Sequence, residues 1–181
     1  MLFEYFARKL LKRAGISLHS KSSRDWTIPS GLPNGNERRR LIPDLIFDIG
    51  KATYVFDVKY KSFDFVYRVS REDLFQLHTY VGQVSNKHDL KGCGLIYPIR
   101  ESRWEKCGLE RVQGIVSKTI IQAGRSVPFH VAFIKVPEAQ TEFGEFRNRF
   151  KSLLEQFLGV FLNRLVPNGT SQMSTRFQST A

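Results

Sequence analysis

Residues 42–61 read IPDLIFDIGKATYVFDVKYK and carry three aspartates and three lysines within two otherwise apolar segments. The β-branched and aromatic residues on either side of Gly50-Lys51 predict two strands joined by a two-residue turn. Buried strand faces seldom carry ionised groups, because an unpaired buried charge costs much free energy. The charges of this hairpin therefore raise the question of what brings them together.

The predicted turn places two of the aspartates opposite each other. If Gly50-Lys51 forms the turn, Asp44 pairs with Asp57, with Cβ atoms about 4.5–5.5 Å apart. Lys59 follows on the same strand face. A divalent cation such as Mg²⁺ or Mn²⁺ would relieve the repulsion between the two carboxylates. Two alternatives stay open: a three-residue loop would turn Asp44 away, and the charges could form a surface pair on an exposed sheet face.

The pattern of apolar residues predicts an α/β domain with a mixed central sheet flanked by helices. We expect helices at 2–14, 70–84 and 139–165, and strands at 25–28, 40–49, 52–60, 93–99, 112–121 and 127–136. Residues 1–137 are expected to form the core domain. Residues 138–166 would then form an amphipathic helix that packs on the core or on a partner, and 167–181 a disordered tail.

The composition favours a polyanionic partner. The 181 residues include 28 Lys and Arg against 17 Asp and Glu, a formal net charge of +11. Such a surplus points to nucleic acid first and to an anionic membrane second. The apolar stretch FLGVFLNRLV is interrupted by Asn163 and Arg164 and falls short of the ~20 residues of a membrane span. With two cysteines and no visible signal peptide, we expect a cytoplasmic protein.

The hairpin resembles a known nuclease motif. Pro43-Asp44, twelve further residues and then Asp57-Val58-Lys59 are similar to the PD-(D/E)xK motif. The resemblance implies a restriction-endonuclease-like core over residues 1–137. It also implies that Asp44 and Asp57 bind Mg²⁺, with Mn²⁺ as a substitute, and that the Val58 carbonyl is a further ligand. Lys59 would then orient the attacking water and stabilise charge on the phosphate.

Neighbouring segments extend this resemblance. Gln76 and Tyr80 resemble the Q-x-x-x-Y motif of RecB-like nucleases. The ordered segments LFEYFARKLL, LIPDLIF, VFDVKYK and DLFQLHTY are similar to the nuclease domain of the McrC subunit of 5-methylcytosine restriction systems, over residues 2 to about 100. That likeness implies that Glu4 completes the metal shell and that Gln76 and Tyr80 support the site or contact DNA. The residues alone also allow a Glu4–Arg8 pair within the helix and a core-edge position for Gln76 and Tyr80.

The implied activity is Mg²⁺-dependent hydrolysis of phosphodiester bonds in double-stranded DNA, in a restriction system that acts in phage defence. The resemblance also implies an AAA+ GTPase partner, although the family's usual region for engaging that subunit would precede the helix with which this chain starts. Arg38, Arg39 and Arg40 are expected to follow the DNA backbone, or else to lie in a solvated loop. Two other functions stay open: a non-catalytic nucleic-acid-binding or assembly module with the nuclease fold, and a RecB-like repair nuclease.

Overall fold

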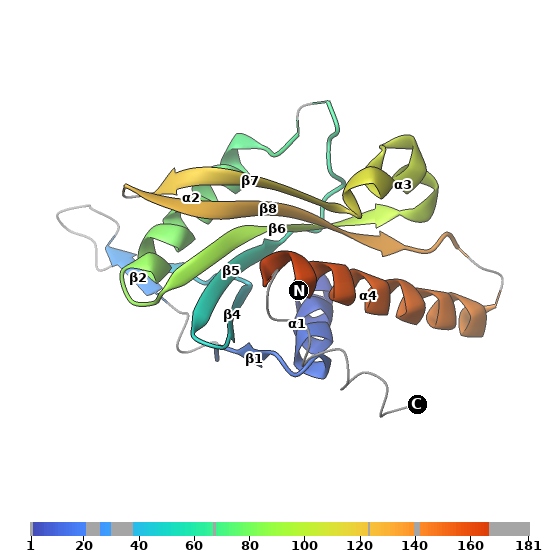
Figure 1. The fold of residues 1–181 in the computed structure, drawn as a ribbon, viewed down its shortest axis with the longest axis horizontal. Coiled ribbons are helices and arrows are strands. Elements are labelled where there is room, and N and C mark those ends of the chain that lie inside the picture. Colours follow the sequence, from blue (N-terminus) through green and yellow to red (C-terminus); the bar gives the residue numbers. More distant parts are fainter. Residues whose placement is uncertain are drawn as a thin grey trace.

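The computed structural model describes residues 2–20, 26–29, 38–66, 68–122, 124–139 and 142–166. A six-stranded sheet with the order β1-β4-β5-β6-β8-β7 forms the centre of this fold (Figure 1). Its strands are β1 (Ser17–Leu18), β4 (Leu45–Ile49), β5 (Ala52–Val58), β6 (Leu90–Arg100), β7 (Ile115–Gln122) and β8 (Arg125–Val136). The helices are α1 (Leu2–Arg13), α2 (Arg71–Ser85), α3 (Glu101–Lys106), the 3-10 helix η2 (Leu109–Val112) and α4 (Phe143–Leu165). The predicted α/β architecture with a mixed sheet is confirmed.

The sheet combines parallel and antiparallel pairs. Strands β5, β6 and β8 are parallel neighbours, whereas β4 pairs with β5 and β7 pairs with β8 in antiparallel hairpins. Parallel neighbours require a crossover connection, and α2 provides the one between β5 and β6. The carboxyl ends of β5 and β6 therefore lie on the same side of the sheet as the amino end of β4.

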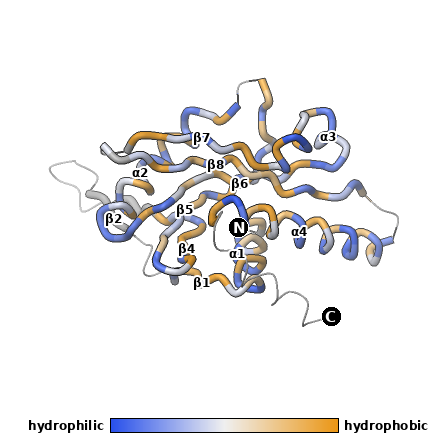
Figure 2. Tube along the Cα trace, viewed as in Figure 1, coloured by the Kyte–Doolittle hydropathy of each residue, from blue (hydrophilic) through white to orange (hydrophobic). Residues whose placement is uncertain are grey.

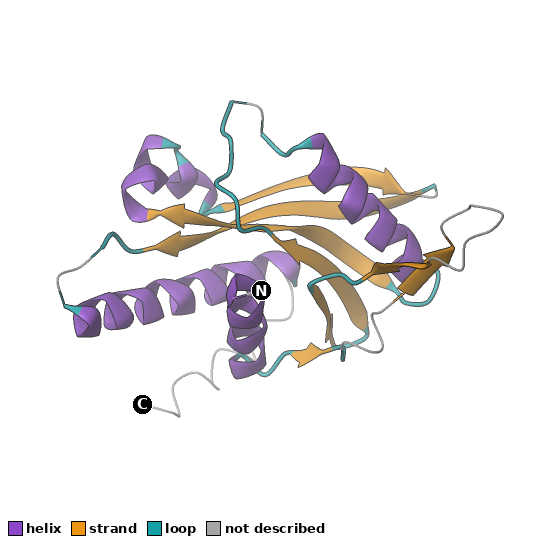
Figure 3. Cartoon of the chain, turned by 180° about the vertical axis from the view of Figure 1, so that it is seen from behind, coloured by secondary structure: helices purple, strands orange, loops and turns teal. Residues whose placement is uncertain are grey.

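Both faces of the sheet are covered. In β5, Tyr54, Phe56 and Val58 belong to the core shared with α1 and α4. The alternate residue Val55 belongs to a second core shared with α2. Seen from behind, α2 lies across the face of the sheet that Figure 1 turns away from the reader (Figure 3). Both faces of β5 therefore pack against helices.

The long helix α4 buries one side and exposes the other, and hydrophobic and hydrophilic residues alternate along it (Figure 2). Leu154, Phe157, Phe161 and Leu165 recur at helical spacing and pack into the core next to α1. Near its start, Phe143 is 77% exposed. Among the helices in the described ranges, none carries an apolar stretch of the length that a membrane span requires.

The predicted strand at 40–49 is interrupted. Strand β3 (Arg38–Leu41) ends before Pro43, and β4 starts only at Leu45. Because Pro43 has no N–H to donate, it cannot take part fully in a strand ladder. Strand β3 instead pairs with β2 (Trp26–Pro29), which covers most of the predicted strand at 25–28, in a separate two-stranded sheet. The predicted tail at 167–181 lies outside the described residues.

The predicted hairpin register is confirmed. Leu45 pairs with Phe56 and Ile49 with Ala52, which leaves Gly50-Lys51 as the turn. Gly50 has a φ of 61°, a left-handed conformation that glycine adopts at little cost. Continued by one step beyond Leu45, this register places Asp44 opposite Asp57.

Candidate active site

Two carboxylates converge at the end of β5. Asp44 lies in the short segment before β4, and its Oδ2 accepts a hydrogen bond from the Val58 N–H at 2.8 Å. Burial, and then the negative charge of Asp57, raise the pKa of Asp44 to about 7. The charge of Glu4 also raises the pKa of Asp44, which places Glu4 of α1 near the same site. The structure thus brings together Asp44, Asp57 and Glu4, the carboxylates that the sequence predicted at the site.

Asp57 is far more buried than the sequence indicated. The alternative of an exposed sheet face is wrong, because α2 covers this face and Asp57 is only 3% exposed. A buried carboxylate needs a positive or hydrogen-bonding partner. Lys59 provides one, with its Nζ 2.5 Å from Asp57 Oδ2.

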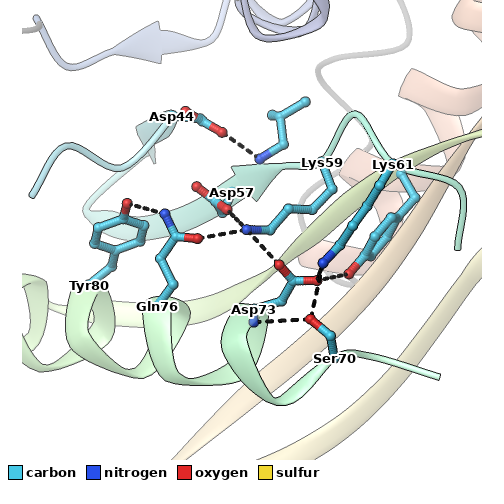
Figure 4. Close-up of polar contacts among 10 residues, drawn as sticks. Asp44, Asp57, Lys59, Lys61, Ser70, Asp73, Gln76 and Tyr80 are labelled. Carbon is cyan, nitrogen blue, oxygen red and sulfur yellow. Dashed lines mark hydrogen bonds and ion pairs between the residues drawn. The ribbon is translucent and has the colours of Figure 1, made fainter. Parts of the chain in front are cut away.

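The Lys59 ammonium is held between β5 and α2 (Figure 4). Besides Asp57, it has two acceptors: Asp73 Oδ1 at 2.9 Å and Gln76 Oε1 at 2.7 Å. Burial alone would lower the pKa of Lys59, but its hydrogen bond and ion pair with Asp57, together with Asp73, raise it above the ordinary value. Lys59 therefore stays protonated at neutral pH and presents a fixed positive charge.

Asp73 is a member of this cluster that the sequence reasoning missed. It is 4% exposed and lies in the first turn of α2. Its Oδ2 lies 2.7 Å from Lys61 Nζ and accepts a hydrogen bond from the Tyr97 hydroxyl at 3.0 Å. Burial alone would raise the pKa of Asp73, but hydrogen bonds from Lys61, Lys59 and Ser70 outweigh burial and lower it to about 2.

In the sequence, Asp73 is interpreted only as part of a helix cap. Ser70 and Asp73 have the spacing of a capping box. The structure shows half of that arrangement, since Ser70 Oγ accepts a hydrogen bond from the Asp73 backbone N–H at 3.2 Å. The carboxylate is directed at Lys59 and Lys61.

Gln76 and Tyr80 form the next contact outward. Gln76 Nε2 donates to the Tyr80 hydroxyl at 2.7 Å, one helical turn away on α2. Burial, and then the charge of Asp57, raise the pKa of Tyr80 to about 12, so its hydroxyl keeps its proton. Gln76 contacts Lys59, whereas Tyr80 contacts Gln76 and is buried in the core beneath α2. Their support of the site and their contact with DNA stay predictions.

Arg8 on α1 and the three arginines of β3 lie on other elements than the cluster around Lys59. The Arg8 guanidinium donates to the backbone carbonyls of Asp44 at 3.0 Å and His19 at 3.2 Å, so it fixes the segment that carries Asp44. The start of α1 lies beside the segment after β5, because the Phe3 N–H donates to the hydroxyl of Tyr60. Arg38, Arg39 and Arg40 lie on β3, and their side chains fall outside what the structure describes.

The donor set suits a hard cation better than zinc. Within the described ranges, no group of three or more His, Cys, Asp or Glu residues gathers as a ready metal site. Mg²⁺ commonly binds through one or two carboxylates and keeps several waters, so the pair Asp44 and Asp57 meets its needs. Besides burial, the charges of Asp57 and Glu4 raise the pKa of Asp44, and a bound cation would offset the repulsion among these carboxylates. The residues present therefore fit Mg²⁺ or Mn²⁺.

The sequence of this chain matches a family model over slightly more than half of its length. The family model described as McrBC 5-methylcytosine restriction system component matches residues 1–98. These residues include α1, the β4–β5 hairpin, α2 and most of β6, and thus every residue of the cluster around Lys59. No curated protein matches the chain.

Proposed function

The chain belongs to the family of McrBC 5-methylcytosine restriction system components, and from this premise we propose that it is the DNA-cleaving subunit of a modification-dependent restriction system. The proposed reaction is Mg²⁺-dependent hydrolysis of phosphodiester bonds within double-stranded DNA. The observation that carries the proposal is the pair Asp44 and Asp57, facing each other beside the fixed ammonium of Lys59.

Asp44, Asp57 and Val58 are the proposed metal ligands. In a strand, the N–H and C=O of a paired residue point to the same side. The Val58 N–H points at Asp44 Oδ2, so its carbonyl oxygen is expected on the side of Asp44 as well. Glu4 adds a carboxylate nearby and could bind the cation directly or through water. When bound, Mg²⁺ supplies Lewis acidity and an activated water to the reaction.

Lys59 is proposed to act on the phosphate. Hydrolysis builds negative charge on the phosphoryl oxygens, and a preorganised cation at that place stabilises the transition state without having to reorganise. The Lys59 ammonium has this preorganisation, because its side chain is only 11% exposed and has acceptors on β5 and α2. Gln76 and Tyr80 keep the ammonium aligned from the side of α2.

The test is a plasmid-nicking assay with the purified chain. We expect conversion of supercoiled DNA to open-circular and linear forms in Mg²⁺ or Mn²⁺ and none in EDTA. A parallel arm adds an AAA+ GTPase subunit of a restriction system, which we propose as the partner. DNA binding without cleavage in every arm would contradict the proposal and favour a non-catalytic module that keeps the nuclease fold.

The chain alone is expected to bind DNA without sequence preference and to lose affinity steeply as salt rises. Its net charge of +11 favours contacts with the phosphate backbone, and each neutralised phosphate releases counterions on binding. For about six to ten such contacts, affinity should fall ~10³–10⁵-fold between 50 and 200 mM salt. The measurement is fluorescence anisotropy on two unrelated duplexes of equal length. Tight, sequence-specific binding that changes little with salt would contradict the expectation.

A further inference from the structure

Asp73 occupies a position that a nuclease site of two carboxylates and a lysine does not require. It is 4% exposed and ionised, and burying a carboxylate is costly unless cations and donors surround it. Each of its two oxygens contacts different partners. Oδ1 lies 2.9 Å from Lys59 Nζ, while Oδ2 lies 2.7 Å from Lys61 Nζ and accepts from the Tyr97 hydroxyl. The carboxylate therefore joins the Lys59 ammonium to β6 and to the segment after β5.

The need for such a link follows from the position of Asp57. Lys59 has its shortest contact, 2.5 Å, with Asp57 Oδ2. A carboxylate that also gives an oxygen to a cation is a weaker partner for an ammonium, because the cation withdraws its charge. Lys59 then depends on its acceptors on α2. Of these, Asp73 carries a charge, and hydrogen bonds between charged groups are roughly twice as strong as neutral ones.

We propose that Asp73 is a positioning residue for the reaction: its carboxylate, held in place by Lys61, keeps the Lys59 ammonium at the reacting phosphate while Asp57 serves the metal ion. This assignment rests on the proposed nuclease function. It gives Asp73 a role through Lys59, with no direct contact to substrate or metal. A displaced lysine would lower the rate of the chemical step and leave the affinity for DNA largely unchanged, because misplacing a reacting group by about 1 Å can cost ~10²-fold.

The alternative is that Asp73 only anchors α2 to the sheet. Two variants separate these roles. Asp73→Asn keeps the size of the side chain and removes its charge, so it weakens the hold on Lys59. Tyr97→Phe removes the hydrogen bond that Asp73 accepts from β6 and leaves both lysine contacts in place. A purely structural Asp73 predicts parallel losses of stability and cleavage in the two variants, whereas a positioning role predicts that cleavage falls strongly only in Asp73→Asn.

The first readout is the cleavage rate under single turnover, with DNA affinity measured in Ca²⁺. We expect Asp73→Asn to cleave ~10–100-fold more slowly, with a Kd for DNA within about threefold of wild type. Tyr97→Phe should stay within about threefold of the wild-type rate. If Asp73→Asn cleaves at the wild-type rate, or if both variants lose rate in step with their melting temperatures, the assignment is wrong.

The second readout does not depend on activity. The Lys59 ammonium, assigned by its loss in Lys59→Met, is observed by ¹H–¹⁵N NMR in the metal-free protein and after addition of Mg²⁺. We expect its hydrogens to exchange about tenfold faster in Asp73→Asn than in wild type or Tyr97→Phe, most clearly with Mg²⁺. Unchanged exchange overturns the positioning role. A wild-type chain that cuts no DNA would instead defeat the proposed function, and the NMR result would still decide whether Asp73 holds Lys59.

If Asp73→Asn does not fold, the double variant Asp73→Asn/Lys61→Met serves in its place. It removes the Lys61 charge together with the carboxylate that Lys61 contacts, so no unpaired cation remains at the start of α2. The same slow cleavage and fast ammonium exchange are expected of it. Wild-type behaviour in both readouts would overturn the proposal.

Discussion

Asp57→Asn and Lys59→Met are each expected to reduce DNA cleavage by about 10³-fold or more and to leave DNA binding nearly intact. Asp57 is the buried carboxylate between the proposed metal and Lys59, and Asn removes its charge at constant size. Lys59→Met removes the ammonium and keeps a side chain of similar length. Neither residue belongs to the arginine-rich strand β3, which is proposed to follow the DNA backbone, so affinity should change by less than about threefold.

The measurement is a single-turnover cleavage rate in Mg²⁺, with circular dichroism and DNA affinity recorded on the same preparations. Lys91→Met is the matched control. Lys91 forms a surface pair with Asp89 at 3.0 Å near the start of β6, at the opposite end of that strand from the site, and its side chain is 55% exposed. Such pairs contribute little, so Lys91→Met should cut at the wild-type rate. A Lys59→Met protein that cuts like this control would remove Lys59 from the mechanism.

Asp44→Asn is expected to stabilise the metal-free protein at neutral pH. Burial and the neighbouring Asp57 raise the pKa of Asp44 to about 7, against about 3.9 in an unfolded chain. The folded state therefore holds this proton more tightly than the unfolded state does. The favourable contribution is present at low pH and is lost as pH rises between ~4 and 7. Asn has no proton to lose, and its oxygen can still accept from the Val58 N–H.

The expected gain from Asp44→Asn at pH 7.5 is about 1–3 kcal/mol, or a melting temperature ~3–8 °C higher in EDTA. The variant should also lose the stabilisation that Mg²⁺ or Mn²⁺ gives to wild type, which would be about 2.7 kcal/mol at a metal concentration a hundredfold above Kd. Thermal melts at several pH values provide the test. The control is Asp89→Asn, since Asp89 is 60% exposed in a surface pair. A lower melting temperature for Asp44→Asn than for wild type, with an equal gain from Mn²⁺, would show that the two aspartates share no metal.

The hairpin could be predicted from the sequence because its signals are local. A glycine that tolerates a left-handed conformation, flanked by β-formers, fixes the turn, and the turn fixes which residues face each other. Gly50 has the conformation this requires, and Leu45 pairs with Phe56 as expected. The break at Pro43 was not predicted, although the proline itself explains it. The break releases Asp44 from the ladder, so that its side chain meets the Val58 N–H.

The environment of Asp57 could not be predicted from the hairpin alone. In a sequence, an aspartate two residues before a lysine is compatible both with a solvated carboxylate and with a buried one that pairs with the lysine. The choice depends on α2, which packs across that face and brings Asp73 and Gln76 to Lys59. Contacts between segments this far apart in sequence leave no local pattern. For the same reason Tyr97 of β6, a partner of Asp73, was not nominated.

The most direct test of a metal centre at Asp44 and Asp57 is a titration of Mn²⁺ followed by electron paramagnetic resonance. It is made in the Lys59→Met background with duplex DNA present, so that the site is complete and does not turn over. We expect one bound Mn²⁺ per chain in Lys59→Met and none once either Asp44→Asn or Asp57→Asn is added. Equal Mn²⁺ binding in all three proteins would contradict a metal centre at these two aspartates.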